Sequence, residues 1–489
     1  MMNWKMWQKC VGKMGKKLPI FLFIFILLYV IGSLICYPLL TKRHVLKQKE
    51  KYAEQAAKET VDRSASVRCL DDNTQALVYR LALIESAQRE LIMTTFDMSD
   101  GESGQDLMAA MLQAADRGVR IRLMVDGINA WLKLEKSDLF GAFSTHPNIE
   151  IRFYNPIRLT KLWKLNYRMH DKYLIADDTA YILGGRNSNN LFLGAYRDTY
   201  NIDRDLYVLE RTEKNASDVM QKKERNSLQD IKAYFEKIWV QPDQKIFRKK
   251  ETEKTKEGLA LLREHYKELQ TAYPEAFSET ETLLTQDLIR VDSIRFLHNP
   301  LYADEKVPVV YQRICQEMEQ GETILIQTPY IICDKGMYQD LSELCRAGKQ
   351  IEIITNAVES GANPWGCTDY LNERKSILKT GAGVYACMAG QSLHTKTVLI
   401  DDETSIVGSY NLDLRSTYLD TELMLLVKSK ELNKQLRDQA AAYQEKSAYE
   451  KAGKPSRTGS LYEKKEMSGM QKVIYSILRI LIRPIREVL

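Results

Sequence analysis

Hydrophobic and polar positions follow three different patterns along this chain of 489 residues. The first is an uncharged apolar run, LPIFLFIFILLYVIGSLICYPLL, at residues 18–40. As a helix rising about 1.5 Å per residue, it is long enough to cross a hydrocarbon core of roughly 30 Å. A cleaved signal peptide is the alternative, but the run exceeds the usual apolar region of such peptides and no A-x-A site follows it. We therefore expect a single-pass protein of the cell membrane, anchored by residues 18–40.

The second pattern is an order of elements that occurs twice. Apolar strand-like stretches, ELIMTTF at residues 90–96 and TILIQTP at 323–329, each follow a helical stretch. Each is then followed by an amphipathic helix that ends near a glycine and by a further strand. A pair of strands completes each series. The fold class predicted is α/β, with two similar units packed pseudo-symmetrically around one site.

The third pattern is an amphipathic helix in residues 470–489. At 100° per residue its cations fall within about 60° of one another, and they are Lys472, Arg479, Arg483 and Arg486. The apolar residues opposite them are Ile474, Ile477, Leu478, Leu481, Ile485 and Val488. This pattern is typical of a helix that lies on anionic lipid, whereas packing on the protein's own core is the alternative. Pro484 should kink the helix because it lacks an amide donor.

These patterns divide the chain into seven segments. We predict a basic tail (1–17), the transmembrane helix (18–40), a polar stalk that lifts the body from the membrane (41–66), a first repeat (67–245), a charged helical connector (246–290), a second repeat (291–440) and a basic tail with the amphipathic helix (441–489). Within the first repeat, RLTKLWKLNYRMH at residues 158–170 reads either as a loop through which substrate enters or as a half-buried strand.

Net charge is concentrated at the two ends of the chain. The total is +5, residues 1–17 carry +5 and residues 470–489 carry +3, which leaves −3 for the rest. A body without net positive charge is a poor binder of nucleic acid, because phosphate neutralisation supplies most non-specific affinity. Lysines flank the apolar run on both sides, so the charge rule leaves the membrane orientation undecided. The 8 cysteines form no C-x-x-C pair, and we expect neither a metal site nor a disulfide framework.

Two stretches carry the same polar residues at the same spacing. They are RMHDKYLIADDTAYILGGRNSNN at residues 168–190 and SLHTKTVLIDDETSIVGSYNLDLRS at 392–416. One offset of 224 residues relates His170 to His394, Lys172 to Lys396, Asp177 to Asp401, Gly184 to Gly408 and Asn187 to Asn411. Five matches in register are hard to obtain by chance. We therefore expect one motif, present twice.

Strand geometry explains the H-x-K spacing. Residues i and i+2 lie on one face of a strand, so an imidazole and an ammonium stand side by side and can meet one phosphate. Asp177 and Asp401 lie seven residues after the histidines, which is an odd step, so they would point to the other face. We read them as organisers of the motif rather than as reacting groups.

The end of each stretch offers groups that could bind phosphate. Gly184 and Gly408 would let the backbone approach a ligand closely, and the amides of Asn187 and Asn411 could donate to phosphate oxygens. Ser409 adds a hydroxyl in the second stretch, where the first has Gly185.

These stretches resemble the duplicated HKD motifs of the phospholipase D superfamily. GSYNLDLRSTYLDTE looks like the bacterial cardiolipin synthases of that superfamily, and the resemblance covers roughly residues 67–440. It implies a site between two halves that uses no metal or other cofactor. One histidine attacks phosphorus to form a phosphohistidine, and the other protonates the departing alcohol and then activates the incoming hydroxyl. His170 is assigned as the nucleophile and His394 as the acid and base, although the symmetry makes the reverse nearly as defensible.

The resemblance also implies further roles around the two histidines. Lys172 and Lys396 would offset charge on the phosphoryl oxygens. A carboxylate should fix the tautomer of each histidine: Glu422 matches the family's acidic position for His394, and the same alignment makes Asp205 the equivalent for His170. The alternative is that these two acids are exposed side chains beside strands.

The function expected is a membrane-anchored phosphatidyltransferase, a cardiolipin synthase that joins two phosphatidylglycerols and releases glycerol. A phospholipase D hydrolase would use the same residues with water as the acceptor and would release phosphatidic acid. A nuclease of the superfamily is disfavoured by the membrane helix and the −3 body, and a non-catalytic scaffold by the intact motifs. The partners expected are anionic phospholipid and the membrane, with no nucleic acid, and the sequence leaves the oligomeric state open.

Overall fold

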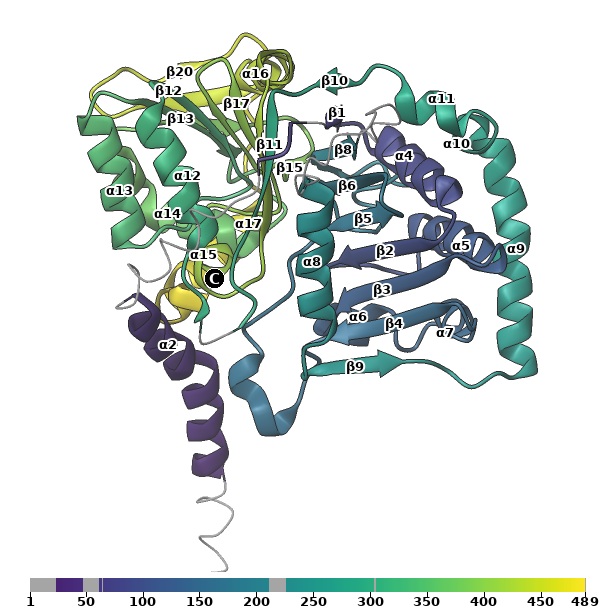
Figure 1. Cartoon of the computed structure of the whole chain (residues 1–489). Helices are drawn as coiled ribbons and strands as arrows, with labels where there is room; N and C mark the ends of the chain where they lie inside the picture. Colours follow the sequence, from purple (N-terminus) through teal and green to yellow (C-terminus); the bar gives the residue numbers. More distant parts are fainter. Residues whose placement is uncertain (1–22, 47–60, 64, 211–225, 303–304, 489) are drawn as a thin grey trace, which may run out of the picture.

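Two α/β halves stand side by side in the computed structural model, which describes residues 23–46, 61–63, 65–210, 226–302 and 305–488 (Figure 1). Each half is built on a mixed sheet, and within the described residues each sheet has 9 strands. Several strands near the middle of each sheet are buried along their whole length, for example β5 (Tyr173–Ala176) and β6 (Ala180–Gly184). Continuous apolar strands of this kind are expected where layers cover both faces of a sheet.

The two sheets have the same topology. In the first half the order is β10 (Ile289–Arg290), β1 (Ser66–Leu70), β8 (Asp205–Leu209), β6, β5, β2 (Glu90–Thr95), β3 (Arg120–Asp126), β4 (Ile149–Tyr154) and β9 (Gln244–Phe247). In the second half it is β11 (Ser293–His298), β18 (Leu423–Lys428), β17 (Thr404–Gly408), β16 (Thr397–Ile400), β12 (Thr323–Gln327), β13 (Gln350–Asn356), β14 (Gly383–Cys387), β19 (Ser447–Glu450) and β20 (Arg457–Thr458). The predicted internal repeat is therefore present strand by strand, from β1 and β11 to β9 and β19.

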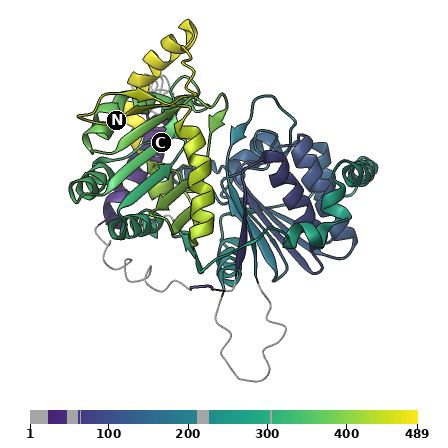
Figure 2. The ribbon, with the colours of Figure 1, turned by 90° about the horizontal axis from the view of Figure 1, so that it is seen from above.

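Three hydrophobic cores hold these layers together. One lies between the first sheet and its outer helices α4 (Asn73–Ser86), α5 (Glu102–Asp116), α6 (Gly127–Lys133) and α7 (Asp138–Phe143). Another lies between the second sheet and α12 (Val309–Gln320), α13 (Lys335–Arg346) and α14 (Pro364–Lys379). The central core joins both sheets through α8 (Ser227–Trp239) and α16 (Lys430–Gln444) (Figure 2). Apolar burial across this central core fixes the halves relative to each other.

Two predicted segment boundaries differ from the structure. The connector forms helices α9 (Glu253–Ala272), α10 (Pro274–Phe277) and α11 (Thr280–Thr285), as its pattern predicts, but it ends by adding β10 to the first sheet. The second repeat continues past residue 440, because β19 pairs with β14 and β20 pairs with β19. The segment that follows the second half therefore begins after residue 458 rather than at 441.

The apolar N-terminal run forms a helix that is long and apolar enough to cross a membrane, Phe23–Val45, with a mean hydropathy of 2.4. We call it the anchor helix; it includes a π-helical turn, η1 (Gly32–Cys36), and α2 (Tyr37–Leu46). Its last residues contact the body instead of lifting it away as a stalk: the Lys42 ammonium lies 2.8 Å from carboxylate oxygens of Asp334 and Glu487. Residues 47–60 of the predicted stalk lie outside the described residues.

Residues 159–164 form a 3-10 helix, η2 (Leu159–Lys164), rather than a strand. It packs against the anchor helix, where the Tyr29 hydroxyl donates to the carbonyl of Leu159 at 2.9 Å. The Asn166 amide likewise donates to the Leu34 carbonyl at 2.8 Å. The segment that precedes His170 therefore lies against the anchor helix.

Residues 469–488 form α17 (Gly469–Leu481) and a 3-10 turn, η4 (Arg483–Val488), so the α-helix ends before Pro484. Two of the four predicted surface cations bind the body instead. Arg479 donates to the Asn372 side chain at 2.9 Å, and Arg486 pairs with Asp369 at 2.7 Å. The predicted apolar stripe does not face outward as a whole, because Leu478 packs on the core between the second sheet and its outer helices.

Candidate active site

The two H-x-K pairs enter equivalent strands from the side where the halves meet. Lys172 immediately precedes β5, and Lys396 immediately precedes β16. Both strands pair antiparallel with the first strand of the parallel set, β2 and β12 respectively. His170 is only 8% exposed and Lys172 and Lys396 are 2% and 1% exposed, so this is a buried site. The shared sheet register explains why one constant offset relates the two motifs.

Short backbone pairings between the halves bring the motifs together. Met169 bridges Thr421, and β7 (Asn201–Ile202) pairs in parallel with β15 (Ser392–Leu393). The His394 amide also donates to the Ile202 carbonyl at 2.7 Å. Each segment that leads into a histidine therefore lies beside the segment that leads into an acidic residue of the other half.

Each histidine bonds to a carboxylate from the opposite half. His170 Nδ1 lies 2.9 Å from Glu422 Oε1, and His394 Nδ1 lies 2.5 Å from Asp203 Oδ2. With Nδ1 held in this way, Nε2 is the ring nitrogen that would face substrate in each half, and the Lys396 ammonium lies 3.2 Å from Nε2 of His394. Glu422 was predicted to orient His394, but it bonds to His170 instead. His394 bonds to Asp203, so the orienting acid of the first half is Asp203 rather than the predicted Asp205.

The strand register explains the error over Asp205. Gly184 lies opposite Asp205 in the first sheet, whereas Gly408 lies opposite Met424 in the second. Counting back two residues makes Asp203 the counterpart of Glu422. The side chain of Asp205 instead pairs with two buried arginines, with Arg80 at 2.9 Å and Arg186 at 3.5 Å. Asp205 is therefore part of the packing of the first half and does not contact His170.

The two orienting carboxylates have different surroundings. Glu422 accepts hydrogen bonds from the hydroxyls of Ser409 and Ser416. Its complete burial raises the pKa of the carboxyl to about 8, against the charge of Lys172 and these hydroxyl bonds. Burial also opposes ionisation of Asp203, but the charges of Lys396 and His394 outweigh it and hold the Asp203 pKa below its ordinary value.

Burial likewise favours neutral forms of the reacting groups. It lowers the pKa of His394 to about 4, with Lys396 adding to the effect, and lowers that of His170 well below its ordinary value, with Lys172 adding. The pKa of Lys172 falls to about 7 for the same reason. Lys396 lowers the pKa of His170, and Lys172 that of His394, so the two halves share one electrostatic site.

A phenylalanine ring packs edge-on against each histidine, and sequence reasoning missed both. The ring centroids of Phe96 and His170 are 5.0 Å apart, and so are those of Phe192 and His394. Both phenylalanines come from the first half, so the repeat offers no signal for them. An apolar wall beside each ring limits its rotation and excludes water.

Asp177 and Asp401 lie at the far ends of the motif strands, away from the two histidines. The Asp177 carboxylate accepts three backbone amides, from Gln88, Arg89 and Glu90, at 2.8 to 2.9 Å. Asp401 accepts the amide of Thr323 at 2.8 Å and that of Glu322 at 2.9 Å. Both have positive φ angles, 52° and 48°, which an aspartate tolerates in a turn. These contacts agree with the prediction that the two aspartates organise the motif rather than react.

The motif glycines face a neighbouring strand rather than open space. A Cβ at Gly184 would lie 2.1 Å from Asp205 Oδ1, and one at Gly408 would lie 2.1 Å from the Leu423 carbonyl oxygen. Their role is therefore close strand packing, which corrects the expectation of close approach to a ligand. Gly185 has a related role, because a Cβ there would lie 2.3 Å from Asp203 Oδ1.

The motif asparagines are buried and poorly satisfied. Asn187 and Asn411 are 6% and 3% exposed. Among the described residues, the side-chain oxygen of each has no hydrogen-bond partner. A buried carbonyl oxygen without a partner is costly unless a donor pairs with it, so each oxygen is a candidate acceptor for a substrate hydroxyl, while donation by the amide nitrogens to phosphate stays a prediction.

Two further buried groups tie the halves together beside the site. Asp171, between His170 and Lys172, accepts from Thr421 Oγ1 at 2.6 Å and from the Tyr234 hydroxyl at 2.7 Å. Arg204 donates across the interface to Gln327 at 2.9 Å and to the Thr397 hydroxyl at 3.0 Å. Neither residue has an equivalent in the other motif, which is why the repeat did not predict them.

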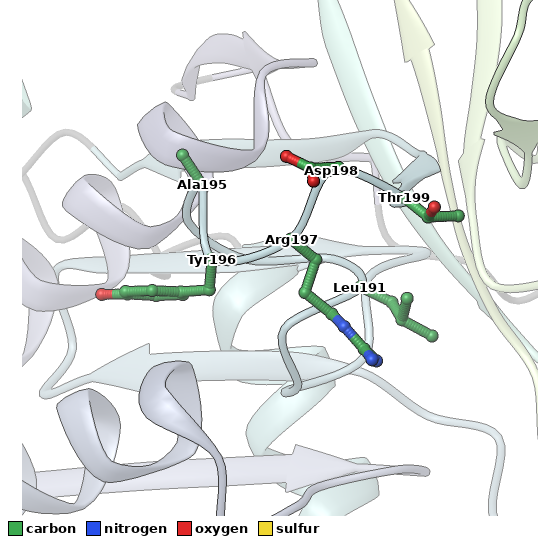
Figure 3. Close-up of a pocket in the computed structure, with 6 residues that line it drawn as sticks. All are labelled: Leu191, Ala195, Tyr196, Arg197, Asp198 and Thr199. Carbon is green, nitrogen blue, oxygen red and sulfur yellow. The ribbon is translucent and has the colours of Figure 1, made fainter.

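A cavity of about 520 Å³ lies at the loop around Phe192, lined by Leu191 and residues 195–199 (Figure 3). The side chains of Leu191 and Arg197 extend to one side of the loop, and Tyr196 extends to the other (Figure 3). Leu191 adjoins Phe192, whose ring packs on His394.

As for metals, the described residues contain no group of three His, Cys, Asp or Glu that could hold an ion.

Comparison with known proteins agrees with this architecture. The family described as "Cardiolipin synthase, PLD-like domain" matches residues 81–239 and 314–443. The chain is 26% identical over 399 residues to cardiolipin synthase C of Escherichia coli (strain K12), covering 74% of this chain and 81% of that protein. It is 25% identical over 359 residues to the major cardiolipin synthase ClsA of Bacillus subtilis (strain 168), covering 73% and 64%.

Among solved structures, phosphatidylserine synthase from Haemophilus influenzae has a similar fold. The TM-score is 0.60 at 16% sequence identity, and the match covers 90% of this chain and 100% of that chain.

Proposed function

The chain belongs to the cardiolipin synthase family of the phospholipase D superfamily and is a phospholipid phosphatidyltransferase, and from this premise we propose that it makes cardiolipin from two phosphatidylglycerols. The observation that carries the proposal is the crossed pair of histidines. Each imidazole has Nδ1 bonded to a carboxylate of the other half, within one buried site that also holds two lysines. Such a site can hold one phosphodiester between an imidazole that attacks phosphorus and an imidazole that acts as acid and base.

In the first step, Nε2 of His170 attacks the phosphorus of phosphatidylglycerol. A P–N bond forms, the P–O bond to glycerol breaks, and His394 gives its proton to the departing glycerol oxygen. In the second step, His394 takes the proton of a hydroxyl on the second phosphatidylglycerol. That oxygen attacks phosphorus and the P–N bond breaks, which yields cardiolipin and restores both histidines.

The surroundings of the histidines support this division of roles. Asp203 is held ionised beside His394, and its charge stabilises the protonated imidazole from which His394 donates, against the burial and the Lys396 charge that lower the pKa of this ring. Glu422 is held by two serine hydroxyls, which suits a fixed orientation of His170. The charge on the phosphoryl oxygens would be offset by Lys172 and Lys396. The amide nitrogens of Asn187 and Asn411 would donate hydrogen bonds to the same oxygens.

The cavity next to Phe192 supports a lipid rather than water as the acceptor. Its lining combines an apolar side chain, Leu191, with the guanidinium of Arg197, the carboxylate of Asp198 and the hydroxyl of Thr199. A second phosphatidylglycerol headgroup could lie there with its phosphate at Arg197 and a glycerol hydroxyl at Asp198, and the loop leads through Phe192 to His394. Water needs no such space.

The test is to incubate the purified enzyme with phosphatidylglycerol vesicles and identify the products. Cardiolipin and glycerol in equal amounts are expected, whereas phosphatidic acid as the main product would favour the hydrolase. His170→Ala should abolish both products. His265→Gln is the matched control, because His265 bonds to Asp106 on the outer face of the first half and should retain activity.

The anchor helix supports a single pass through the cell membrane, close to the lipid substrate. The expected result is that the full chain stays in the membrane pellet after carbonate extraction. A chain that lacks residues 1–46 should leave the pellet on carbonate extraction, and retention of that shortened chain under this treatment would contradict the proposal.

A further inference from the structure

Helix α17 carries two separate apolar faces. Tyr475 and Leu478 pack on the core of the second half, and Ile482, just after the helix, is fully buried. A different set of apolar side chains remains exposed, from 43% to 72%, and comprises Met470, Val473, Ile474, Ile477, Ile480 and Leu481. Their spacing places them along one stripe of the helix, and the packed set lies on another. A contiguous exposed apolar stripe on an otherwise docked helix calls for a partner.

The position of α17 is fixed by contacts at the end of the anchor helix. Lys42, near the last residue of that helix, bonds at 2.8 Å to Glu487 in η4, directly after α17. Figure 1 shows the anchor helix leaving the body downwards, and Figure 2, viewed from above, shows α17 lengthwise in yellow. Helix α17 therefore runs across the direction of the membrane helix, at the end where that helix meets the body.

Residues deeper along the anchor helix indicate where the bilayer lies. Leu159 in η2 is 78% exposed, yet its carbonyl bonds to the hydroxyl of Tyr29, well inside the apolar run. A bilayer that covers Tyr29 also covers Leu159. Lys42 lies 13 residues further on, about 20 Å along a helix, which places α17 near the headgroups rather than in the hydrocarbon.

The charges of α17 fit an anionic lipid surface. Lys472 and Arg483 are exposed on the polar side of the helix and its continuation, where long side chains can reach headgroups while the apolar stripe enters the boundary of the acyl chains. Acidic residues are absent from α17 itself.

We propose that α17 lies in the headgroup layer of the membrane with the stripe of Met470, Val473, Ile474, Ile477, Ile480 and Leu481 buried in anionic lipid. Together with the anchor helix, it fixes the catalytic body against tilting, because two contacts at an angle define an orientation that one helix leaves free. This inference concerns the placement of the protein and holds whichever alcohol is the acceptor.

The test is photo-crosslinking in the full-length protein. A benzophenone amino acid replaces Leu481 on the exposed stripe or, as the matched control, Ser476, which lies about 140° away around the helix at 100° per residue. Each protein is reconstituted in vesicles of phosphatidylglycerol and phosphatidylcholine, irradiated, digested and analysed by mass spectrometry. Lipid adducts are expected several-fold more often at position 481 than at 476.

Three outcomes would overturn the proposal: adducts at 481 to a second copy of the chain, which would make the stripe a protein interface; no adducts at 481; or equal lipid adducts at both positions. The readout does not use enzymatic activity, so it stays informative if the proposed reaction is wrong. A second variant, Ile477→Asp with Leu481→Asp, should lose activity on vesicles several-fold relative to Ser476→Asp, and retention of activity would contradict the orienting role.

Discussion

His170 Nδ1 lies 2.9 Å from Oε1 of Glu422, a residue of the opposite half. The reciprocal bond joins His394 to Asp203 at 2.5 Å. Neither half alone therefore contains a histidine with its own orienting carboxylate. Formation of the site requires the halves to dock, and the short strand pairs β7 with β15 and Met169 with Thr421 set the register of docking.

The first prediction separates the two neighbouring acids Asp203 and Asp205. Asp203→Asn removes the anion that holds His394, so kcat/KM should fall by roughly 10²- to 10⁴-fold; because Asp203 also pairs with buried Lys396 at 3.5 Å, some loss of stability should accompany it. Asp205→Asn breaks the buried pairs with Arg80 and Arg186, so it should destabilise the fold by about 3 kcal/mol. Vesicle assays and thermal unfolding measure the two effects.

Each of these variants is the control for the other. Near-normal kcat/KM in a folded Asp203→Asn protein would contradict the assignment of Asp203 to the site. An Asp205→Asn protein that unfolds normally but has lost catalysis would restore the alignment that matched Asp205 with Glu422.

The contrast between these acids shows how far the sequence alone could lead. The offset of 224 located both H-x-K pairs, because strand, turn and strand have equal lengths in the two motifs. The segment between Asn187 and Asp203 is five residues longer than its counterpart before Glu422, so the offset could not locate the acid. Strand pairing could locate it, since Val208 then matches Val427 across the sheets. Contacts between the halves, such as those of Arg204, depend on docking and leave no local pattern.

The second prediction concerns Gly185, which stands where the second motif has Ser409. In Gly185→Ala the added Cβ would lie 2.3 Å from Asp203 Oδ1, which is too close, so the Asp203 side chain must move away from His394. We expect a loss of kcat of about tenfold or more, without loss of membrane association. Gly336→Ala is the control, because its Cβ would make an ordinary 3.4 Å contact. Unchanged turnover in Gly185→Ala would show that this glycine does not position Asp203.

The third prediction is a dependence on pH that comes from Lys172. Burial lowers the pKa of its ammonium from 10.5 to about 7, so the charge that would stabilise the phosphoryl oxygens is present below about pH 7 and is lost as pH rises through that value. kcat/KM on vesicles should therefore decline on the alkaline side. Lys172→Arg keeps its charge and should move this decline to higher pH, even if the rate is lower. Identical alkaline limbs in the two proteins would assign the titration to another group.

The last prediction distinguishes the roles of the histidines by removing the need for an acid. A phosphatidyl ester of p-nitrophenol departs without protonation, so His394→Ala should still release nitrophenol in a burst of about one equivalent per site and then stop for lack of a base. The lipid phosphate should remain bound to His170, which mass spectrometry of the digested protein detects. His170→Ala should give no burst. If instead His170→Ala gives the burst and His394 carries the phosphate, the roles are reversed, while the crossed pairs with Glu422 and Asp203 would still orient both rings.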